Sequence, residues 1–400
     1  MYLVFKRLPI EWYAIALPLL ILFLFFRLVE PAAFSRSGST FETFLSLAFS
    51  FLGFFTITVL LYVLYRTVRW SARLIKRSIT DMFVSHSGGV TLSVKRETLA
   101  SAGMICLLLG SIFYLHASLM EMLLYSHSAQ EVALFSAYFT QLDSSLLGEG
   151  GIANLLRFSN QYPLFQSVAA VAYDLLVFIS GTVLMLSFLH SIKLFRTFLI
   201  GFFLLFILAI PLWYTMPAVS PTQFLLEGVT GEVISEPLQV VAIKLDQELP
   251  MTTATYQTVY ARLVDAWQGK MLVLNQEQEF AITTNPSLHV ALGILCVYFA
   301  WRMSWLLGVV LTVYQAINMF ATMLLLQHYV IDIPFGVLVG VLAVLIARQA
   351  LLFEAEYMQV QTKKEFYLLE RCRKDLVRFF QLFIPSQFFR SDISAADKIR

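Results

Sequence analysis

Long apolar segments decide what this chain can fold into. They lie at about 10–30, 43–65, 99–124, 163–191, 197–216, 285–301, 304–326 and 329–351. Each is long enough to cross the hydrocarbon core of a bilayer as a helix, at about 1.5 Å per residue. Backbone N–H and C=O groups in lipid must pair internally, which excludes lipid-exposed loops and open sheets. We therefore predict an all-α integral membrane protein with about eight transmembrane helices.

The composition agrees with a chain that has lipid as its main solvent. Hydrophobic residues make up 58% and charged residues 14% of the 400 residues, whereas a soluble domain carries about 25% charged residues. The net charge of +2 is too small to indicate nucleic acid as a partner. Cys106, Cys296 and Cys372 lie far apart and match neither a disulfide framework nor a zinc site. We expect no metal and no cofactor.

Basic residues set the orientation of the predicted spans. They gather on alternate connections, and the connections between these are poor in Lys and Arg. Positive charge marks the cytoplasmic side, so both termini are predicted to be cytoplasmic. The spans that begin near 285 and 329 then start from the periplasmic, extracellular or lumenal side. The basic residues are Lys6, Arg7, Arg66, Arg69, Arg73, Lys76, Arg77, Lys95, Arg96, Lys193, Arg196 and Arg302.

The predicted organisation has three parts. Residues 1–98 form two N-terminal helices and a basic cytoplasmic loop, 99–352 form a six-helix core, and 353–400 form an amphipathic cytoplasmic tail. The core contains a long acidic outer loop at 217–283. Residues 125–162 mix apolar and polar side chains at helical spacing, which predicts a helix in the membrane interface.

A short polar motif opens the span near 285, with the sequence Asn285-Pro286-Ser287-Leu288-His289. Asn is favoured as an N-cap and Pro at the first helical position. Free amides of Ser287 and Leu288 would then form an anion site beside His289. A plain helix cap with an incidental interfacial histidine is the alternative for this segment alone.

A second motif opens the last span, with the sequence His328-Tyr329-Val330-Ile331-Asp332. Residues four apart share a helix face, so Asp332 can hold one imidazole nitrogen of His328 and leave the other free to attack phosphorus. A structural His–Asp pair is the alternative, although a carboxylate at the start of a span is costly and often functional. Because the topology places His289 and His328 on one membrane face, the two motifs can build one site.

Together, the two motifs resemble the second and third motifs of the type 2 phosphatidic acid phosphatase superfamily. Pro-Ser-Leu-His followed by His-Tyr-Val-Ile-Asp is most similar to the branch that includes the inositol phosphorylceramide synthases. The 39 positions from His289 to His328 and the glycine at 336 also fit. So does the proline-bearing segment Pro217-Ala218-Val219-Ser220-Pro221. The resemblance implies a six-helix core over about 99–351, with the first two spans as an addition.

The resemblance also implies a role for each residue. His328 would be the nucleophile and form a phosphohistidine, and Asp332 would orient it. His289 would protonate the leaving group and then deprotonate the acceptor. Ser287, Asn285 and the local amides would hold phosphate oxygens. No metal is implied, because the protein supplies positive charge and amide dipoles.

Two departures concern the cations that hold phosphate in this family. The first motif, a Lys followed by Arg-Pro, is absent from 217–283, and Thr322 stands where an Arg usually precedes the nucleophile by six residues. The inositol phosphorylceramide synthase-like branch also tends to lack that Arg. Arg262 is the first candidate for a replacement cation and Lys270 the second. For each, a solvated loop charge is the alternative.

These observations predict a membrane enzyme that transfers a phosphoryl or phospho-headgroup from a lipid phosphate at the non-cytoplasmic surface. Transfer to a lipid alcohol is favoured, and a lipid-phosphate or polyprenyl-phosphate phosphatase is the alternative. The partners would be phospholipid, acceptor lipid and bilayer. A transporter or scaffold is the rival from another class, but the sequence shows no matching pair of broken helices, and Asp174 alone is too little charge for a coupled pathway. Pairing of Asp174 with His116, which would pin two helices, is the favoured interpretation of that residue.

Overall fold

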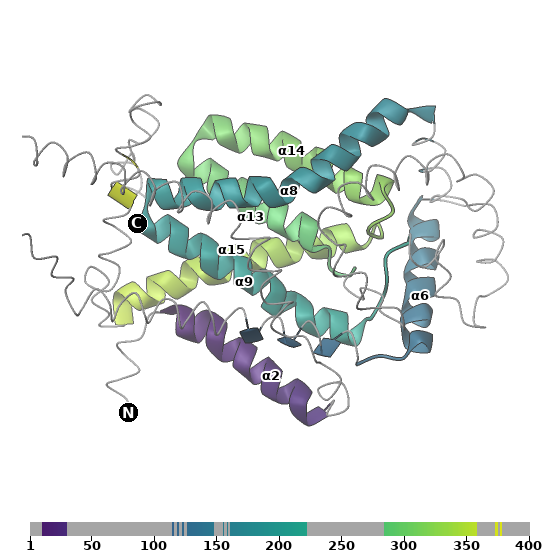
Figure 1. The fold of residues 1–400 in the computed structure, drawn as a ribbon, viewed down its shortest axis with the longest axis horizontal. Coiled ribbons are helices and arrows are strands. Elements are labelled where there is room, and N and C mark those ends of the chain that lie inside the picture. The colour runs from purple at the N-terminus through teal and green to yellow at the C-terminus, as the bar shows by residue number, and fades with distance from the viewer. Residues whose placement is uncertain are drawn as a thin grey trace, which may run out of the picture.

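The computed structural model describes residues 10–29, 126–147, 161–221 and 284–357, with single positions at 114–123, 155, 158 and 373–377. Every regular element among them is a helix (Figure 1). Four helices are long and apolar enough to cross a membrane. The helices are η1 (Trp12–Ala16), α2 (Leu17–Val29), α6 (Ala129–Leu147), α8 (Pro163–His190), α9 (Ile192–Thr215), α13 (Leu288–Met303), α14 (Trp305–Leu324) and α15 (Asp332–Tyr357).

The predicted all-helical membrane fold is confirmed for these residues, and the predicted number of spans is not. The spanning helices are α8, α9, α14 and α15, and α13 is a shorter apolar helix of 16 residues. The span expected at 43–65 and most of the one at 99–124 lie outside the described residues. Eight spans therefore remain a prediction.

Single serines join two pairs of neighbouring helices. Ser191 separates α8 from α9 in an extended conformation, and its hydroxyl accepts a hydrogen bond from the Leu194 amide at 3.0 Å. Ser304 separates α13 from α14 with a similar backbone. A serine hydroxyl or an extended residue interrupts one helix and starts the next. The result is two tight helical hairpins.

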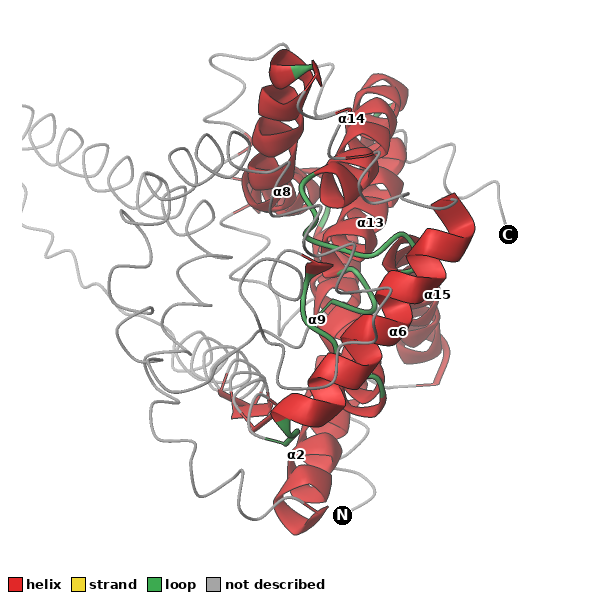
Figure 2. Cartoon of the chain, turned by 90° about the vertical axis from the view of Figure 1, so that its right-hand side faces the viewer, coloured by secondary structure: helices red, strands yellow, loops and turns green. Residues whose placement is uncertain are grey.

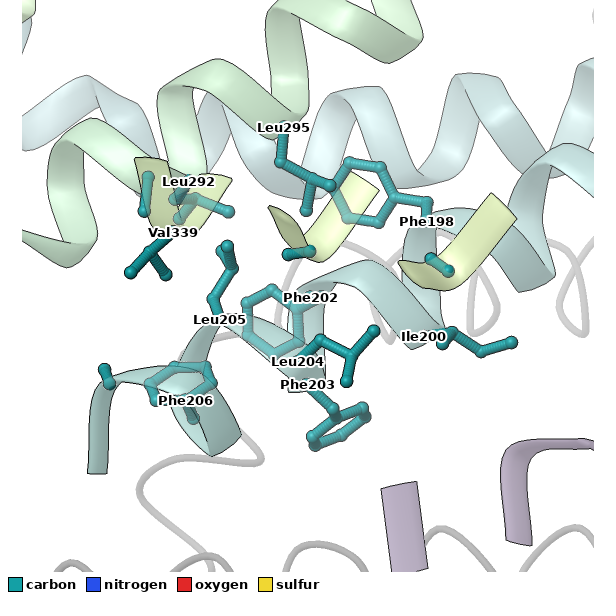
Figure 3. Packing of buried hydrophobic residues seen from close by; sticks show 14 of the residues in the cluster. Phe198, Ile200, Phe202, Phe203, Leu204, Leu205, Phe206, Leu292, Leu295 and Val339 are labelled. Carbon is teal, nitrogen blue, oxygen red and sulfur yellow. The ribbon is translucent and has the colours of Figure 1, made fainter. Parts of the chain in front are cut away.

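The buried core lies around α9, which packs against α13 and α15. Figure 3 shows Phe198, Phe202 and Leu205 of α9 near Leu295 of α13 and Val339 of α15. All of these side chains are buried. Burial of such side chains against neighbouring helices holds the bundle together by close van der Waals packing.

Two glycines bring α15 close to α13. A methyl group on Gly336 would collide with the carbonyl of Ser287 and the side chain of Val290. One on Gly340, a full turn later, would collide with Ala291. Small residues spaced by four allow helix backbones in membranes to approach closely. This contact sets the first turn of α13 directly beside the start of α15.

At the other end of α15, a buried arginine joins three segments of the chain. Arg196 of α9 binds Glu11 with its Nε and Nη2 atoms and Glu354 of α15 with its Nη1 and Nη2 atoms, at 2.5–2.9 Å. The Ile10 amide also donates to Glu354 at 3.1 Å. All three charged residues are at most 5% exposed. We call Glu11, Arg196 and Glu354 the buried charge triad.

Helix α6 lies across the end of the bundle where α15 begins (Figure 1), and the end-on view in Figure 2 shows it in front of that end. Ser128 and Glu131 start the helix with a reciprocal pair of hydrogen bonds between side chain and backbone, at 3.0 and 3.3 Å. The helix expected within 125–162 is therefore confirmed. Its buried face is formed by Val132, Ser136, Phe139, Thr140 and Asp143.

Candidate active site

The two histidines singled out by the sequence lie side by side. His289 is in the first turn of α13, and His328 lies in the connection between α14 and α15. Their ring centroids are 6.0 Å apart, with an angle of 54° between the ring planes. The prediction that both occupy the same end of the bundle is therefore confirmed.

The surroundings of His328 fix which ring nitrogen can react. Its Nδ1 atom lies 3.0 Å from the carbonyl oxygen of Thr284 and 3.4 Å from Oδ2 of Asp332. A carbonyl and an ionised carboxylate can only accept, so Nδ1 carries the proton and donates it to these oxygens. Nε2 then keeps its lone pair, which is the form an imidazole needs to act as a nucleophile.

Asp332 supports the turn that carries His328. Its side chain is 0% exposed, and Oδ2 accepts a hydrogen bond from the Tyr329 amide at 2.8 Å. The other oxygen, Oδ1, is buried and has no hydrogen-bond partner among the residues that the structure describes. The carboxylate therefore binds both the backbone of the turn and the imidazole within it.

The expected helical face shared by His328 and Asp332 is wrong. Helix α15 begins at Asp332, and the residues from His328 to Ile331 form turns. Pro334 explains the difference, because a proline ring clashes with the carbonyl four residues earlier, here that of Val330. The helix can include the proline only in its first turn. The pair still forms, through a turn instead of along a helix.

His289 is held by a residue that the sequence did not point to. Its ring stacks on Tyr173 of α8 with centroids 4.0 Å apart and planes within 12° of parallel. His289 is partly exposed. Stacking restricts the rotation of the imidazole.

The start of α13 differs from the prediction. Ser287, not Asn285, is the N-cap, and its hydroxyl accepts from the Val290 amide at 3.3 Å. The Ser287 amide donates to the Asp332 carbonyl at 3.3 Å, so it is not free for an anion. The close approach of α15 at Gly336 provides that acceptor. Ser287 thus connects the two histidine-bearing segments.

Asn285 is the polar residue at this end with the most unused hydrogen-bonding capacity. It is 1% exposed, and among the described residues neither its amide nitrogen nor its amide oxygen has a hydrogen-bond partner. The neighbouring residue, Thr284, holds His328 through its carbonyl. An unpaired buried amide is costly unless a ligand completes it, so Asn285 can supply donors to a bound phosphate.

The remaining predicted residues divide into two groups. Thr322 is fully buried, and its hydroxyl donates to the Met319 carbonyl within α14 at 2.8 Å. Its own carbonyl accepts from the His328 amide at 3.2 Å, so it supports the nucleophile through the backbone. Arg262 and Lys270 lie outside the described residues, as does His116, the expected partner of Asp174.

Comparison with known proteins places this geometry in a family. A family model described as the PAP2 superfamily matches residues 137–346, from α6 to most of α15. The match includes both histidines and Asp332. Neither the curated proteins nor the solved structures give a match. Since the family match covers more than half of the 400 residues, the chain belongs to the PAP2 superfamily.

Proposed function

We propose that the protein transfers a phospho-headgroup from a membrane phospholipid to a lipid alcohol through a covalent intermediate on His328. The observation that carries this proposal is the hydrogen bond from Nδ1 of His328 to Thr284, backed by Asp332, with His289 at 6.0 Å between ring centroids. It supports Nε2 as the nucleophile and His289 as the proton carrier.

In the first step, the lone pair of Nε2 attacks phosphorus, and the bond from phosphorus to the leaving oxygen breaks. Protonated His289 gives its proton to that oxygen, so the first product leaves as an alcohol. The His328 imidazole now carries a positive charge, which the buried Asp332 carboxylate stabilises at 3.4 Å from Nδ1.

In the second step, neutral His289 takes the proton of the acceptor hydroxyl. The acceptor oxygen attacks phosphorus, the bond from phosphorus to Nε2 breaks, and His328 returns to its starting form. Asn285 is the candidate donor to the phosphate oxygens in both steps, because its side-chain amide is buried and has no partner within the described part of the chain. Water as the acceptor would make the same reaction a hydrolysis.

The charge of the site favours a phosphodiester donor over a phosphomonoester. Among the described residues, the recorded contacts of the two histidines include no lysine or arginine. A phosphodiester carries one negative charge and a monoester about two near neutral pH, so the diester needs less positive charge for binding. Thr322 in place of the usual arginine supports the same choice, as does the resemblance to the inositol phosphorylceramide synthase-like branch. Arg262 and Lys270 stay candidates for a cation.

The orientation proposed for the site is non-cytoplasmic. Three basic residues of the described helices lie at the end opposite the histidines, where Lys193 and Arg196 start α9 and Arg302 ends α13. Arg373 also binds there, donating to the Leu189 carbonyl at 3.0 Å. Positive residues favour the cytoplasmic side, which supports an active site on the other side.

The test uses purified protein in vesicles that contain a phospholipid labelled in its headgroup phosphate and an unlabelled lipid alcohol. We expect label to move into a second lipid, whereas release of the label as a water-soluble phospho-headgroup would instead establish hydrolysis. His328→Ala should abolish turnover, and persistence of turnover would refute the covalent mechanism. His127→Ala, which removes a histidine beside Glu131 outside the site, is the control. Loss of function in Asp174→Asn but not in His289→Ala would favour the transporter.

A further inference from the structure

Helix α6 holds the turn that carries the nucleophile. The two carboxylate oxygens of Asp143 accept the same backbone N–H, that of Val330, at 3.0 and 2.9 Å. Val330 lies midway between His328 and Asp332. Asp143 is 187 residues away in sequence and 2% exposed, so this is a buried contact between distant parts of the chain.

The same face of α6 covers the rest of the turn. The Phe139 ring packs on the Tyr329 ring, with centroids 5.5 Å apart. Ser136 and Thr140 lie near the Tyr329 hydroxyl. Ser136, Phe139, Thr140 and Asp143 follow the spacing of one helical face. Backbone and side chains of the turn are therefore both fitted to α6.

The carboxylate of Asp143 is in a costly place for a purely structural contact. Burial raises the pKa of Asp143, the Val330 amide lowers it and the nearby Asp332 carboxylate raises it, with a net value of about 6. Two buried carboxylates, those of Asp143 and Asp332, thus bind the short turn between His328 and Asp332. A neutral acceptor could hold the Val330 amide with less electrostatic cost, and such costly arrangements concentrate at functional sites.

We propose that Asp143 is a positioning residue for phosphoryl transfer, acting through the Val330 amide to fix the turn that aims Nε2 of His328. This inference rests on the proposed function for its catalytic consequence. Its structural content, that Asp143 immobilises the turn, stands independently of which reaction the site performs. A misplacement of about 1 Å at a reacting atom can lower a rate by about 100-fold.

The experiment compares Asp143→Ala, Asp143→Asn and Gln141→Ala in the full-length protein. Gln141 is exposed on the same helix and serves as the control. We expect kcat to fall about 10- to 100-fold in the Ala variant, with KM for the donor changed by less than about 3-fold. The Asn variant keeps a carbonyl oxygen for the Val330 amide, so it should stay within about 3-fold of the wild type.

Counting active sites separates positioning from folding. In the first turnover, each competent molecule becomes labelled once, and a rapid quench without acid preserves this label. The amount of labelled protein, called the burst, therefore counts the folded, competent molecules. Dividing the rate by this number gives a kcat that does not depend on how much protein has misfolded. A variant that only folds poorly would show a smaller burst with normal kcat. That outcome, or an Ala variant with wild-type kcat, would overturn the inference.

A second measurement does not depend on turnover. His328 is 7% exposed, so diethyl pyrocarbonate should modify it slowly in the wild type. Mass spectrometry should show modification at His328 about 5-fold faster or more in Asp143→Ala, and unchanged in Asp143→Asn and Gln141→Ala, because opening of the turn exposes the ring. Equal rates in all variants would refute the positioning role. If turnover survives in His328→Ala, the proposed function fails while this labelling still decides the role of Asp143.

Discussion

Removal of the Arg196 guanidinium tests how the buried charge triad contributes to stability. In Arg196→Met, Glu11 and Glu354 lose four charge-assisted hydrogen bonds while they stay buried. At about 1.5–3 kcal/mol each, simple addition gives about 6–12 kcal/mol. The stranded acids can take up protons, which limits the loss. We expect about 3–5 kcal/mol, as when one partner of a buried pair is removed.

The assay is thermal unfolding of the detergent-solubilised protein, followed by intrinsic fluorescence. For a chain of 400 residues, the expected loss corresponds to a drop in the unfolding midpoint of about 4–6 °C. Arg27→Met, which changes an exposed arginine of α2, is the matched control and should shift the midpoint by less than about 1 °C. Below the midpoint, kcat should be unchanged. Glu354 lies 22 residues along α15 from Asp332, or about 33 Å away.

The triple variant Glu11→Leu, Arg196→Met, Glu354→Leu removes all three charges of the buried charge triad. It therefore separates the cost of burying these charges from the attraction between them. Apolar residues in place of a complete buried ion network often restore or increase stability, because no charge is left without a partner. We therefore expect the triple variant to recover most of the loss caused by Arg196→Met. A single variant within about 2 °C of the wild type would contradict this reasoning, as would a triple variant no more stable than the single one.

Three further predictions concern the site. Asp332→Asn should lower kcat at least about 100-fold, measured with the labelled phospholipid, because the amide no longer stabilises the imidazolium of the intermediate; activity within about 3-fold would exclude that role. Gly336→Ala should lower the unfolding midpoint and also kcat, since the methyl group collides with Ser287 and separates α15 from α13; a midpoint equal to the wild type would show that the helices are not tightly packed there. The stability difference between Asp143→Asn and the wild type should depend on pH. The pKa of Asp143 is raised from 3.8 to about 6 in the folded protein, so its favourable contribution is complete below about pH 4 and lost as the pH rises through 6. The Asn variant should therefore gain relative stability between pH 4 and 7, by at most about 3 kcal/mol, and a flat difference across that range would contradict the raised pKa.

Much of the helical layout follows from hydropathy alone. The span predicted at 163–191 is α8 at Pro163–His190, and the span at 304–326 is α14 at Trp305–Leu324. Apolar length decides these helices, because the backbone must pair internally wherever lipid surrounds it. The proximity of the two histidines also followed from topology, since one antiparallel pair of helices, α13 and α14, separates their segments.

Contacts between distant segments could not be predicted in the same way. Tyr173 and Asp143 lie in other parts of the sequence than the two motifs, and no local pattern ties them to His289 or His328. Thr284 directly precedes Asn285, but its contact with His328 joins positions 44 residues apart. Asp143 did carry a weak signal, an acid four residues after Phe139 on the apolar face of an amphipathic helix. The cap at Ser287 depends on the approach of α15, which only the packed structure supplies.

The single serines between helices also determine where this protein can move. One extended residue spans about 3.5 Å, so α13 and α14 cannot shift along each other without breaking the backbone hydrogen bonds of Ser304 with Ala300 and Gly308. The position of His289 is therefore tied to that of α14. His328 lies in the connection from Leu325 to Ile331, which is the longer of the two connections between α13 and α15. The distance between the two imidazoles thus depends on the conformation of this one connection, and α6 packs directly against it.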